Sequence, residues 1–372
     1  MGLANIEELY NDCLYHIFDF LTTEDRIIFA QVCHRFRQLF INQCAAKYRM
    51  YTLDKDSSRL ELIQFCICRE AVECLTIDLD HFDTARCYRS YGCETPENCF
   101  QILCQTLAGM LRLEHLVVKQ ESTVIWYTDS KAIRSDMTAV RQLPKLSRIE
   151  IRARDTSSFE RVSQLCHLEE LQILVPKISL ATLVKCCRSS GNLRSLHLGY
   201  ACIQKNLSYI VPHCKNLEVL KFGMPANSSE YLQLARLPKL RQLSYFGIRR
   251  SGSFEPLLSA LAAKSQLTHL SIDGGSLTMQ ETCQLVRIQS LRHFKGFYST
   301  TDCVEMLGCL ANLEELRLSI FCPTDISNNL LPIIAKCKDL KLLQIAGGNV
   351  NTKSLNDAIS LRKSEPVVLV LK

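Results

Sequence analysis

The chain has 372 residues, of which 47% are hydrophobic and 22% are charged. That composition can bury a substantial core and excludes a chain that is disordered throughout. The excess of 44 Lys and Arg over 38 Asp and Glu gives a net charge of +6, too small at this length to require a nucleic-acid partner. No apolar run approaches about 18 residues, and no basic stretch precedes an apolar one near residue 1, so we expect neither a membrane span nor a secretory signal.

Residues 1–50 have helix-like spacing of apolar side chains. Asn11 is a plausible N-cap for a first helix, whose apolar positions at i, i+3, i+4 and i+7 are Leu14, Ile17, Phe18 and Leu21. Thr22 opens a second segment, with Asp25 three residues later in a loose capping box. The apolar stripe of that segment is Ile28, Val32, Phe36, Leu39 and Phe40. A module of about 40 residues is small for independent folding, so its many aromatic residues predict packing against another surface.

This stretch resembles an F-box. The family pattern opens with Leu-Pro, continues with an apolar Leu…Ile-Phe…Leu helix and an Asp, here Asp25, and closes with an apolar helix that ends Val-Cys-x-x-Trp. The matching positions, which the resemblance implies as adaptor contacts, are Leu9, Tyr10, Leu14, Ile17, Phe18, Leu21, Val32, Cys33 and Phe36. Tyr10 replaces the usual Pro and Phe36 the usual Trp, and both remain apolar contacts. The alternative is a generic helical cap on the rest of the chain.

Cysteines are frequent in residues 66–104. Cys66, Cys68, Cys74, Cys87, Cys93, Cys99 and Cys104 suggest a zinc hypothesis, but no Cys-x-x-Cys pair stands among them. We therefore expect no metal ion and no cofactor, and interpret the 20 cysteines as free thiols, most of them buried, in a reducing compartment. Because the sequence also has no phosphate-binding loop, nucleophile elbow or HExxH motif, we expect no catalysis.

An apolar-x-x-apolar-x-apolar pattern recurs through residues 72–372. Clear copies begin at Leu168, Leu193, Leu217, Leu240, Leu267, Leu313 and Leu340, and weaker ones at Val72, Leu113, Leu146, Leu291 and Pro366. The mean spacing of about 24 residues lies in the leucine-rich-repeat range. The last two apolar positions of each copy lie on one face of a strand, and stretches such as 259–264 and 330–337 suit a helical return. One unit cannot bury its own apolar face, so neighbouring units must stack.

The predicted fold is therefore α/β: a leucine-rich-repeat solenoid with a parallel concave sheet and convex helices, preceded by a small all-α F-box helical module. We expect the module at residues 1–48 and a solenoid of about 12 strands at 49–372, with insertions near 81–95 and 120–136. A helix should follow the first insertion, with Thr95 as N-cap and Pro96 at its first position. Cys214, Cys309 and Cys337 precede strand leucines, which resembles the cysteine-containing repeat subclass and predicts thiols packed at the helix-to-strand corner.

Polar residues that flank the strand leucines should form the concave face. The candidate substrate-binding residues are Arg148, Arg152, His197, Lys221, His269, His293 and Arg317 on this face, Tyr200, Phe297 and Tyr298 just past the strands, and Trp126 and Tyr127 in the second insertion. We expect Tyr200 and Tyr298 to be exposed, and Tyr245 and Phe321 to fill gaps between repeats. For Trp126, packing of its own loop onto the array is an equal alternative to binding. The face is mixed in sign, which argues against nucleic acid.

An F-box followed by leucine-rich repeats resembles the substrate-recognition subunit of a Skp–cullin–F-box ubiquitin ligase. The resemblance implies a non-catalytic receptor in the cytoplasm and/or nucleus. Its F-box docks a Skp-type adaptor, and through it a cullin, while its repeats capture a protein substrate. The alternative is a leucine-rich-repeat scaffold with an N-terminal helical cap and no ligase role. A third class, nucleic-acid binding, is suggested by the pI of 8.4 and by Arg249 and Arg250, but such a charge pair is usually a solvated face.

Overall fold

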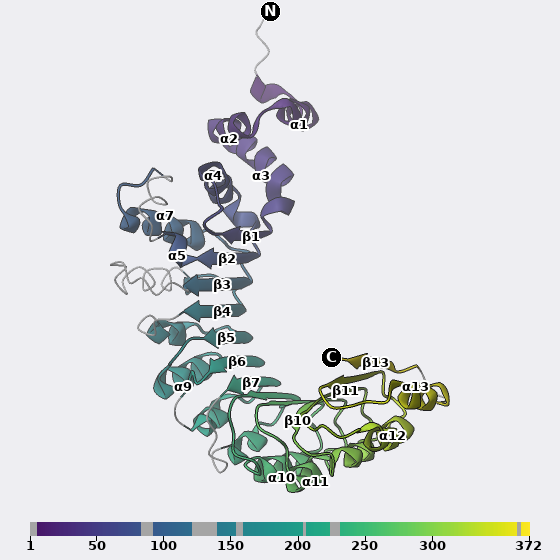
Figure 1. Cartoon of the computed structure of the whole chain (residues 1–372). Helices are drawn as coiled ribbons and strands as arrows, with labels where there is room; N and C mark the ends of the chain where they lie inside the picture. The colour runs from purple at the N-terminus through teal and green to yellow at the C-terminus, as the bar shows by residue number, and fades with distance from the viewer. Residues whose placement is uncertain are drawn as a thin grey trace, which may run out of the picture. The chain divides into compact units, whose positions relative to one another are not determined.

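The computed structural model describes residues 6–82, 92–120, 140–153, 159–203, 206–223, 231–362 and 366–372. It divides into two compact units, Met1–Leu168 and Glu169–Lys372. Within the described ranges there are 13 strands, and their order in the sheet is their order in the chain (Figure 1). None of the helices among these residues is both long enough and apolar enough to span a bilayer.

The first unit begins with three helices, α1 (Asn11–Phe20), α2 (Thr23–Val32) and α3 (His34–Tyr48), after a short 3₁₀ turn η1 (Ile6–Glu8). The Thr22 hydroxyl caps α2 as predicted, accepting from the backbone N–H of Asp25 at 3.2 Å. The predicted second segment is two helices, because Cys33 has an extended backbone and caps α3 through its sulfur. The N-cap prediction for Asn11 was wrong: Asn11 is the first helical residue of α1.

Aromatic packing forms the core of these three helices. The Phe18 ring packs edge-on against the rings of Phe29 and Phe40, at centroid distances of 5.8 and 5.6 Å. The Phe29 and Phe36 rings stack at 4.1 Å, and so join α2 to α3. Leu14 and Leu39 are also buried. The split at Cys33 thus turns Phe36 inward while Ile28 and Val32 stay outside, so the predicted single stripe is divided between two faces.

The strands of the first unit follow these helices. They are β1 (Met50–Leu53), β2 (Cys74–Asp78), β3 (His115–Gln120) and β4 (Arg148–Ala153), each parallel to the next. The helical segments are α4 (Arg59–Cys68), η2 (Arg69–Ala71), α5 (Leu79–Phe82), α7 (Pro96–Ala108) and η3 (Phe159–Gln164). Thr95 caps α7, and Pro96 is its first residue, as predicted. The sequence pattern missed β1, a four-residue strand in which only Leu53 is buried.

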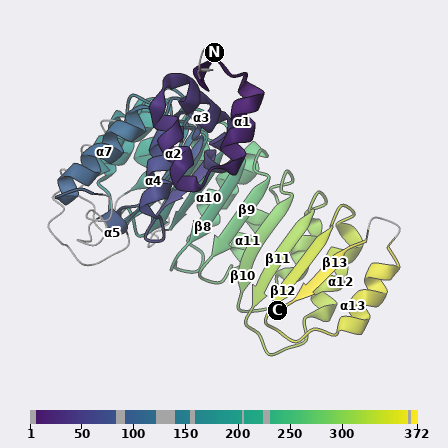
Figure 2. The same cartoon turned by 90° about the horizontal axis from the view of Figure 1, so that it is seen from above.

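The second unit alternates strands with helical segments. Its strands are β5 (Glu170–Leu174), β6 (Ser195–Tyr200), β7 (Val219–Gly223), β8 (Gln242–Phe246), β9 (His269–Asp273), β10 (His293–Tyr298), β11 (Glu315–Ile320), β12 (Leu342–Ala346) and β13 (Val368–Leu371). Its helical segments are α9 (Leu180–Ser189), η4 (Leu207–His213), η6 (Leu232–Arg236), α10 (Glu255–Lys264), α11 (Met279–Leu285), η7 (Val304–Cys309), α12 (Ser327–Lys336) and α13 (Thr352–Ser360). Figure 2 shows α12 and α13 along one face of strands β11 to β13.

Successive repeats of the second unit stack in register. The inward apolar positions of each strand pair with those of the next, as Leu196 pairs with Leu220, and both of these side chains are buried. Side-chain amides add bridges between repeats: Asn216 donates to the carbonyl of Gly191 at 3.0 Å, and Asn312 to that of Gln289 at 2.8 Å. These contacts confirm the α/β leucine-rich-repeat fold that the 24-residue spacing predicts.

The cysteines that precede strand leucines differ in burial. Cys214 and Cys337 are buried, and the Cys337 sulfur donates to the carbonyl of Leu310 at 3.3 Å, as expected at this corner. Cys309 is exposed, so the prediction was wrong for that repeat. Of the 19 described cysteines, nine are buried, fewer than the majority that was expected. Burial raises the pKa of Cys186 and of Cys202 to about 12, which keeps both as neutral thiols at pH 7.

Candidate functional site

The three-helix module leaves large apolar side chains in solvent. Phe20 is 89% exposed, Tyr10 84%, and Ile28 and Val32 62% each. Ile28 and Val32 are four residues apart on α2, so they lie on one face of that helix. Fully burying one such side chain contributes about 1.5–3 kcal/mol. The module therefore carries unused apolar area of the kind that a protein partner would cover.

The structure corrects three of the predicted adaptor contacts. Leu14, Phe18 and Phe36 form the core of the module and are at most 2% exposed. They therefore cannot contact a partner unless the module itself opens. The remaining predicted residues are at least partly accessible: Tyr10 and Val32 are exposed, and Leu9, Ile17, Leu21 and Cys33 are half-buried. Sequence reasoning missed Phe20 and Ile28 as candidate contacts. Three of the nine pattern residues are core residues of this module, so the family pattern alone does not separate core positions from surface positions.

Two arginines hold the helices of the module together. Arg26 on α2 donates from Nε to the carbonyls of Phe18 and Leu21, both at 3.0 Å, and thereby satisfies the C-terminal end of α1. Arg35 on α3 donates from Nη2 to Asn11 Oδ1 at 2.7 Å. The side chain of Asn11, predicted as a cap, is instead the acceptor for this arginine. Both arginines fix the orientation of α1, which carries Phe20.

On the strands of the second unit, the positions that flank the strand leucines, most of them polar, form two rows in register. The first row contains Glu170, Ser195, Val219, Gln242, His269, His293, Glu315 and Leu342. The second contains Gln172, His197, Lys221, Ser244, Ser271, Lys295, Arg317 and Gln344. Arg148 and Arg152 lie on β4 of the first unit, where Arg152 forms an ion pair with Glu150. The side chains of both rows are exposed or half-buried.

Polar and aromatic contacts join side chains within these rows and next to them. The rings of His269 and His293 stack at a centroid distance of 4.0 Å. His293 Nδ1 lies 3.5 Å from Glu315 Oε2, and Arg317 Nη2 lies 3.1 Å from the same oxygen. Lys295 Nζ contacts Asp273 Oδ2 at 2.6 Å. Desolvation, followed by the neighbouring His293, lowers the pKa of His269 from its ordinary value.

The aromatic residues past the strands follow the predictions only in part. Tyr200 is 49% exposed and Tyr245 is buried, as expected. Tyr298 is fully buried, so its assignment to the substrate surface was wrong: it is the last inward position of β10, and pairs in register with Ile320. Phe321 was expected to be buried but is 75% exposed, because it lies beyond the end of β11. The half-buried Phe297 packs against Phe321, with the ring centroids 5.3 Å apart.

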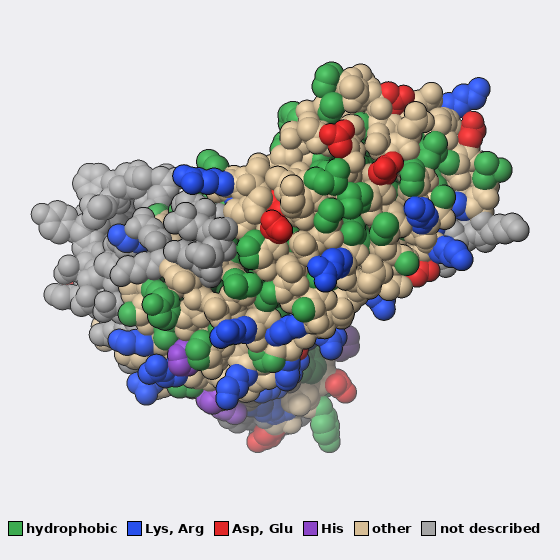
Figure 3. Space-filling view, turned by 90° about the horizontal axis from the view of Figure 1, so that it is seen from below, with side chains coloured by type: hydrophobic (Ala, Val, Ile, Leu, Met, Phe, Trp, Pro, Cys, Tyr) green, Lys and Arg blue, Asp and Glu red, His purple; other side chains and the backbone are tan. Residues whose placement is uncertain are grey.

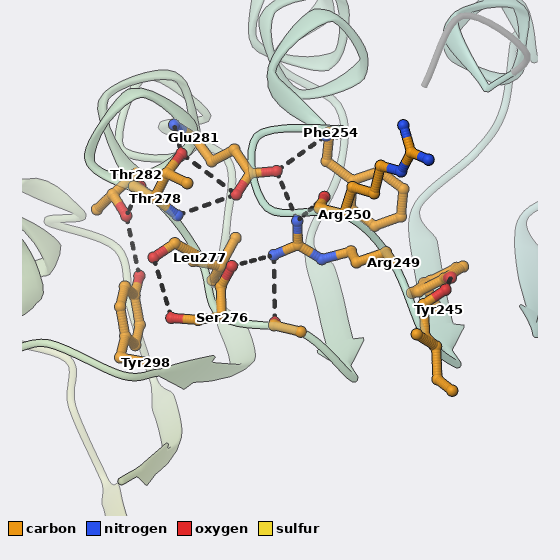
Figure 4. A network of polar contacts seen from close by, with 12 residues as sticks. Tyr245, Arg249, Arg250, Phe254, Ser276, Leu277, Thr278, Glu281, Thr282 and Tyr298 are labelled. Atoms are coloured by element: carbon orange, nitrogen blue, oxygen red, sulfur yellow. Dashed lines mark hydrogen bonds and ion pairs between the residues drawn. The ribbon is translucent and has the colours of Figure 1, made fainter. Parts of the chain in front are cut away.

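Arg249 and Arg250 have different roles, which corrects the expectation of a solvated pair. The side chain of Arg249 is inaccessible, and its Nη1 lies 2.7 Å from Glu281 Oε1 (Figure 4). Arg249 Nη2 donates to the carbonyl of Ser276 at 3.0 Å, and the backbone N–H groups of Phe254 and Thr278 donate to the Glu281 carboxylate at 2.9 and 3.0 Å. This network joins the loop after β8 to the start of α11. Arg250 is exposed.

Several residues that the sequence singles out fall outside the described ranges. Trp126, Tyr127 and Cys87 are among them, as are most of the two predicted insertions. Among the described residues, no group of three or more His, Cys, Asp or Glu side chains could hold a metal ion. The described part of the chain has two surfaces of different chemistry: apolar side chains are exposed on the helical module, and polar side chains on the strands of the repeats.

Comparison with known proteins places the helical module in a family. The F-box domain family matches residues 6–44, which cover α1, α2 and most of α3. No curated protein sequence matches the chain. The solved structures similar to it include the Rad7 and Elc1 complex in yeast, with 12% identity, a TM-score of 0.49, and coverage of 97% of this chain and 90% of that one. Another is an internalin from Listeria monocytogenes, with 14% identity, a TM-score of 0.40, and coverage of 71% and 77%.

Residues 6–44 are thus an F-box domain, and the strands that follow it have the leucine-rich-repeat arrangement. The chain thus carries an F-box domain followed by strands in the leucine-rich-repeat arrangement, the combination that the sequence pattern predicts.

Proposed function

We propose that this protein is the substrate-recognition subunit of a Skp–cullin–F-box ubiquitin ligase. The observation that carries the proposal is the F-box match at residues 6–44, on a module that exposes Tyr10, Phe20, Ile28 and Val32. In this role the chain performs no covalent chemistry and needs no cofactor. It brings a protein substrate, held by the repeats, to a cullin that is bound through the adaptor.

The adaptor site that we propose consists of the accessible apolar residues of the F-box. They are Phe20, Ile28 and Val32, together with Leu9, Tyr10, Ile17, Leu21 and Cys33. Leu14, Phe18 and Phe36 act indirectly, because they hold α1, α2 and α3 together. Since each buried side chain contributes about 1.5–3 kcal/mol, two of them are enough to decide whether the complex survives purification.

The substrate site that we propose is the polar face of the repeats, with the aromatic residues at its edge. His197, Lys221, His293 and Arg317 supply hydrogen-bond donors and charge along the strands. Tyr200, Phe297 and Phe321 supply the large apolar contacts that dominate many protein interfaces. The identity of the substrate depends on how these groups combine over many repeats.

Co-purification of the full chain with a Skp-type adaptor tests the proposal. The double variant Phe20→Glu and Ile28→Glu should lose the adaptor, because two carboxylates would enter an apolar interface. A matched control, Tyr200→Glu and Phe321→Glu, changes two exposed aromatic residues of the repeats and should retain it. If the wild-type chain captures no adaptor, the proposal fails, and the alternative of a repeat scaffold with a helical cap stands.

A further inference from the structure

Positive charge is concentrated in one part of the repeats. Residues 171–254 contain twelve Lys or Arg and two Asp or Glu, a net charge of +10, whereas the whole chain carries +6. The rest of the chain is therefore net negative. Figure 3 shows one face of the molecule, on which Lys, Arg and His side chains gather at the lower left. One of the twelve, Arg249, is buried against Glu281, and the excess that remains attracts partners of opposite charge.

A groove of about 1110 Å³ lies within this basic segment, between α9, η4 and η6. Lys177, Arg188, His213 and Arg236 line it, and none of its lining residues is acidic. We call these basic residues its walls and the apolar lining residues, which include Val184 and Val211, its floor; Tyr209, another lining residue, is 63% exposed. The groove thus combines positive walls with an apolar floor.

Within the described residues, no hydrogen bond or ion pair holds the basic side chains of the groove. Arg188 lies in the last turn of α9, His213 in that of η4 and Arg236 in that of η6. A positive charge at this end of a helix interacts favourably with the helix dipole. In later repeats, Lys264 and Arg362 lie near the same place and donate to backbone carbonyls, Lys264 to Leu237 and Arg362 to Cys337. Arg188, His213 and Arg236 make no hydrogen bond or ion pair with any described residue. Within the described part of the chain, their donors are therefore left for a ligand.

The size of the groove fits a short segment of chain. Helices of neighbouring repeats pack about 8–10 Å apart, so α9, η4 and η6 together span about 20 Å. An extended segment of about six residues covers that distance at about 3.3 Å per residue. Carboxylates on such a segment would meet the basic walls, and apolar side chains would cover the floor. A nucleic acid would leave the floor uncovered, because its phosphates need charge rather than apolar area.

We propose that the groove between α9, η4 and η6 binds an acidic peptide segment of a partner protein, with apolar side chains among its carboxylates. This site lies on the helical side of the repeats, whereas the proposed substrate face is the strand side. The proposal does not depend on adaptor capture by the F-box. Arg188, His213 and Arg236 bind the carboxylates, and Tyr209 packs against the apolar side chains.

Fluorescence anisotropy with the full chain tests this proposal. The probe is a labelled peptide of about ten residues made of Asp, Glu and Leu, compared with the same peptide carrying Asn and Gln instead. The triple variant Arg188→Glu, His213→Glu and Arg236→Glu should bind the acidic peptide at least about tenfold more weakly. The control Arg287→Glu, Lys336→Glu and Lys353→Glu reverses three exposed cations elsewhere in the repeats and should bind within about twofold of wild type.

Four outcomes would overturn the proposal: no binding of the acidic peptide, equal binding of the amide peptide, equal losses in both triple variants, or tighter binding of single-stranded DNA of the same charge that the groove variant abolishes. Because the three substituted side chains make no hydrogen bond or ion pair with any described residue, the reversal loses only their favourable interaction with the helix ends, and thermal unfolding should stay cooperative with a midpoint at most a few degrees below that of wild type. Tyr209→Ala provides a second variant that keeps every charge, and it should weaken peptide binding several-fold. Adaptor capture should be equal in all these variants, which separates this site from the F-box.

Discussion

The F-box and the repeats of the second unit are built on similar apolar cores but expose different chemistry. The F-box buries Phe18 and Phe36 yet leaves Phe20 almost fully in solvent. Strands β5 to β12 bury their inward apolar side chains and expose rows of Ser, Gln, His, Lys and Arg. An apolar surface suits a stable partner, and a polar one with ion pairs already formed suits selective contacts. The difference between the two regions supports separate roles for adaptor and substrate.

The largest effect that we expect concerns the buried ion pair of the repeats. Glu281→Ala leaves the Arg249 guanidinium without a carboxylate in a site with no solvent access. Removing one partner of a buried pair typically costs about 3–5 kcal/mol. Urea denaturation should show a loss of this order in the free energy of unfolding.

The exposed pair between Asp273 and Lys295 is the control. Both side chains are nearly half exposed, so Asp273→Ala should cost at most about 1 kcal/mol. Equal losses for Glu281→Ala and Asp273→Ala would show that the buried network does not stabilise the repeats.

Two neighbouring phenylalanines of α1 sharpen the contrast within the F-box. Phe18→Ala should destabilise the module by about 3–5 kcal/mol, because the ring is fully buried against Phe29 and Phe40. Phe20→Ala should leave stability within about 0.5 kcal/mol and weaken adaptor binding. Thermal unfolding and adaptor titration measure the two effects separately. If Phe20→Ala unfolds the module, Phe20 is a core residue and the proposed adaptor site is wrong.

A smaller effect tests the burial of Tyr298. Its hydroxyl accepts a hydrogen bond from Thr282 Oγ1 at 3.3 Å, and burial raises its pKa. Tyr298→Phe should cost about 1 kcal/mol, the usual net value of one hydrogen bond. Phe321→Ala, at an exposed aromatic residue, should have no measurable effect on the urea midpoint. If Phe321→Ala lost more stability than Tyr298→Phe, then Phe321 would be the buried residue and Tyr298 the exposed one.

The smallest effect concerns pH. The pKa of His269 lies below its ordinary value of 6.5, first because of desolvation and then because of His293. Above pH 6.5 this residue is neutral in both states. Below it the unfolded chain binds more protons, so stability falls as the pH drops from 6.5 towards the pKa in the folded state. His269→Gln should therefore flatten the decline in the unfolding midpoint below pH 6.5, and an unchanged slope would contradict this.

The sequence predicts the repeats well because their spacing is regular. Leucines two residues apart fix which face each strand buries, so the register of His197, Lys221 and Arg317 follows from the pattern. Tyr298 shows where this reasoning fails. A difference of one residue in strand length decides whether an aromatic side chain at the strand end points inward or outward. The apolar pattern does not specify the length of β10.

Contacts between distant residues also escape prediction. Thr278 and Glu281 have the spacing of a capping box, which predicts the start of α11 and not the burial of Glu281. Its partner Arg249 lies 32 residues earlier, and only the stacking of two repeats brings them together. In the F-box, the split at Cys33 decides that Ile28 is exposed and Phe36 buried. A prediction that places both residues on the apolar face of one helix misses the break between α2 and α3.

Hydrogen–deuterium exchange of the full chain, alone and with a Skp-type adaptor, tests the central claim most directly. We predict that the adaptor slows exchange in peptides that cover α1 and α2, where Phe20, Ile28 and Val32 are exposed. Peptides that cover β8 to β11 should exchange at the same rate in both samples, because that face is left for the substrate. Protection of β8 to β11 with no change in α1 and α2 would contradict the assignment of the two surfaces.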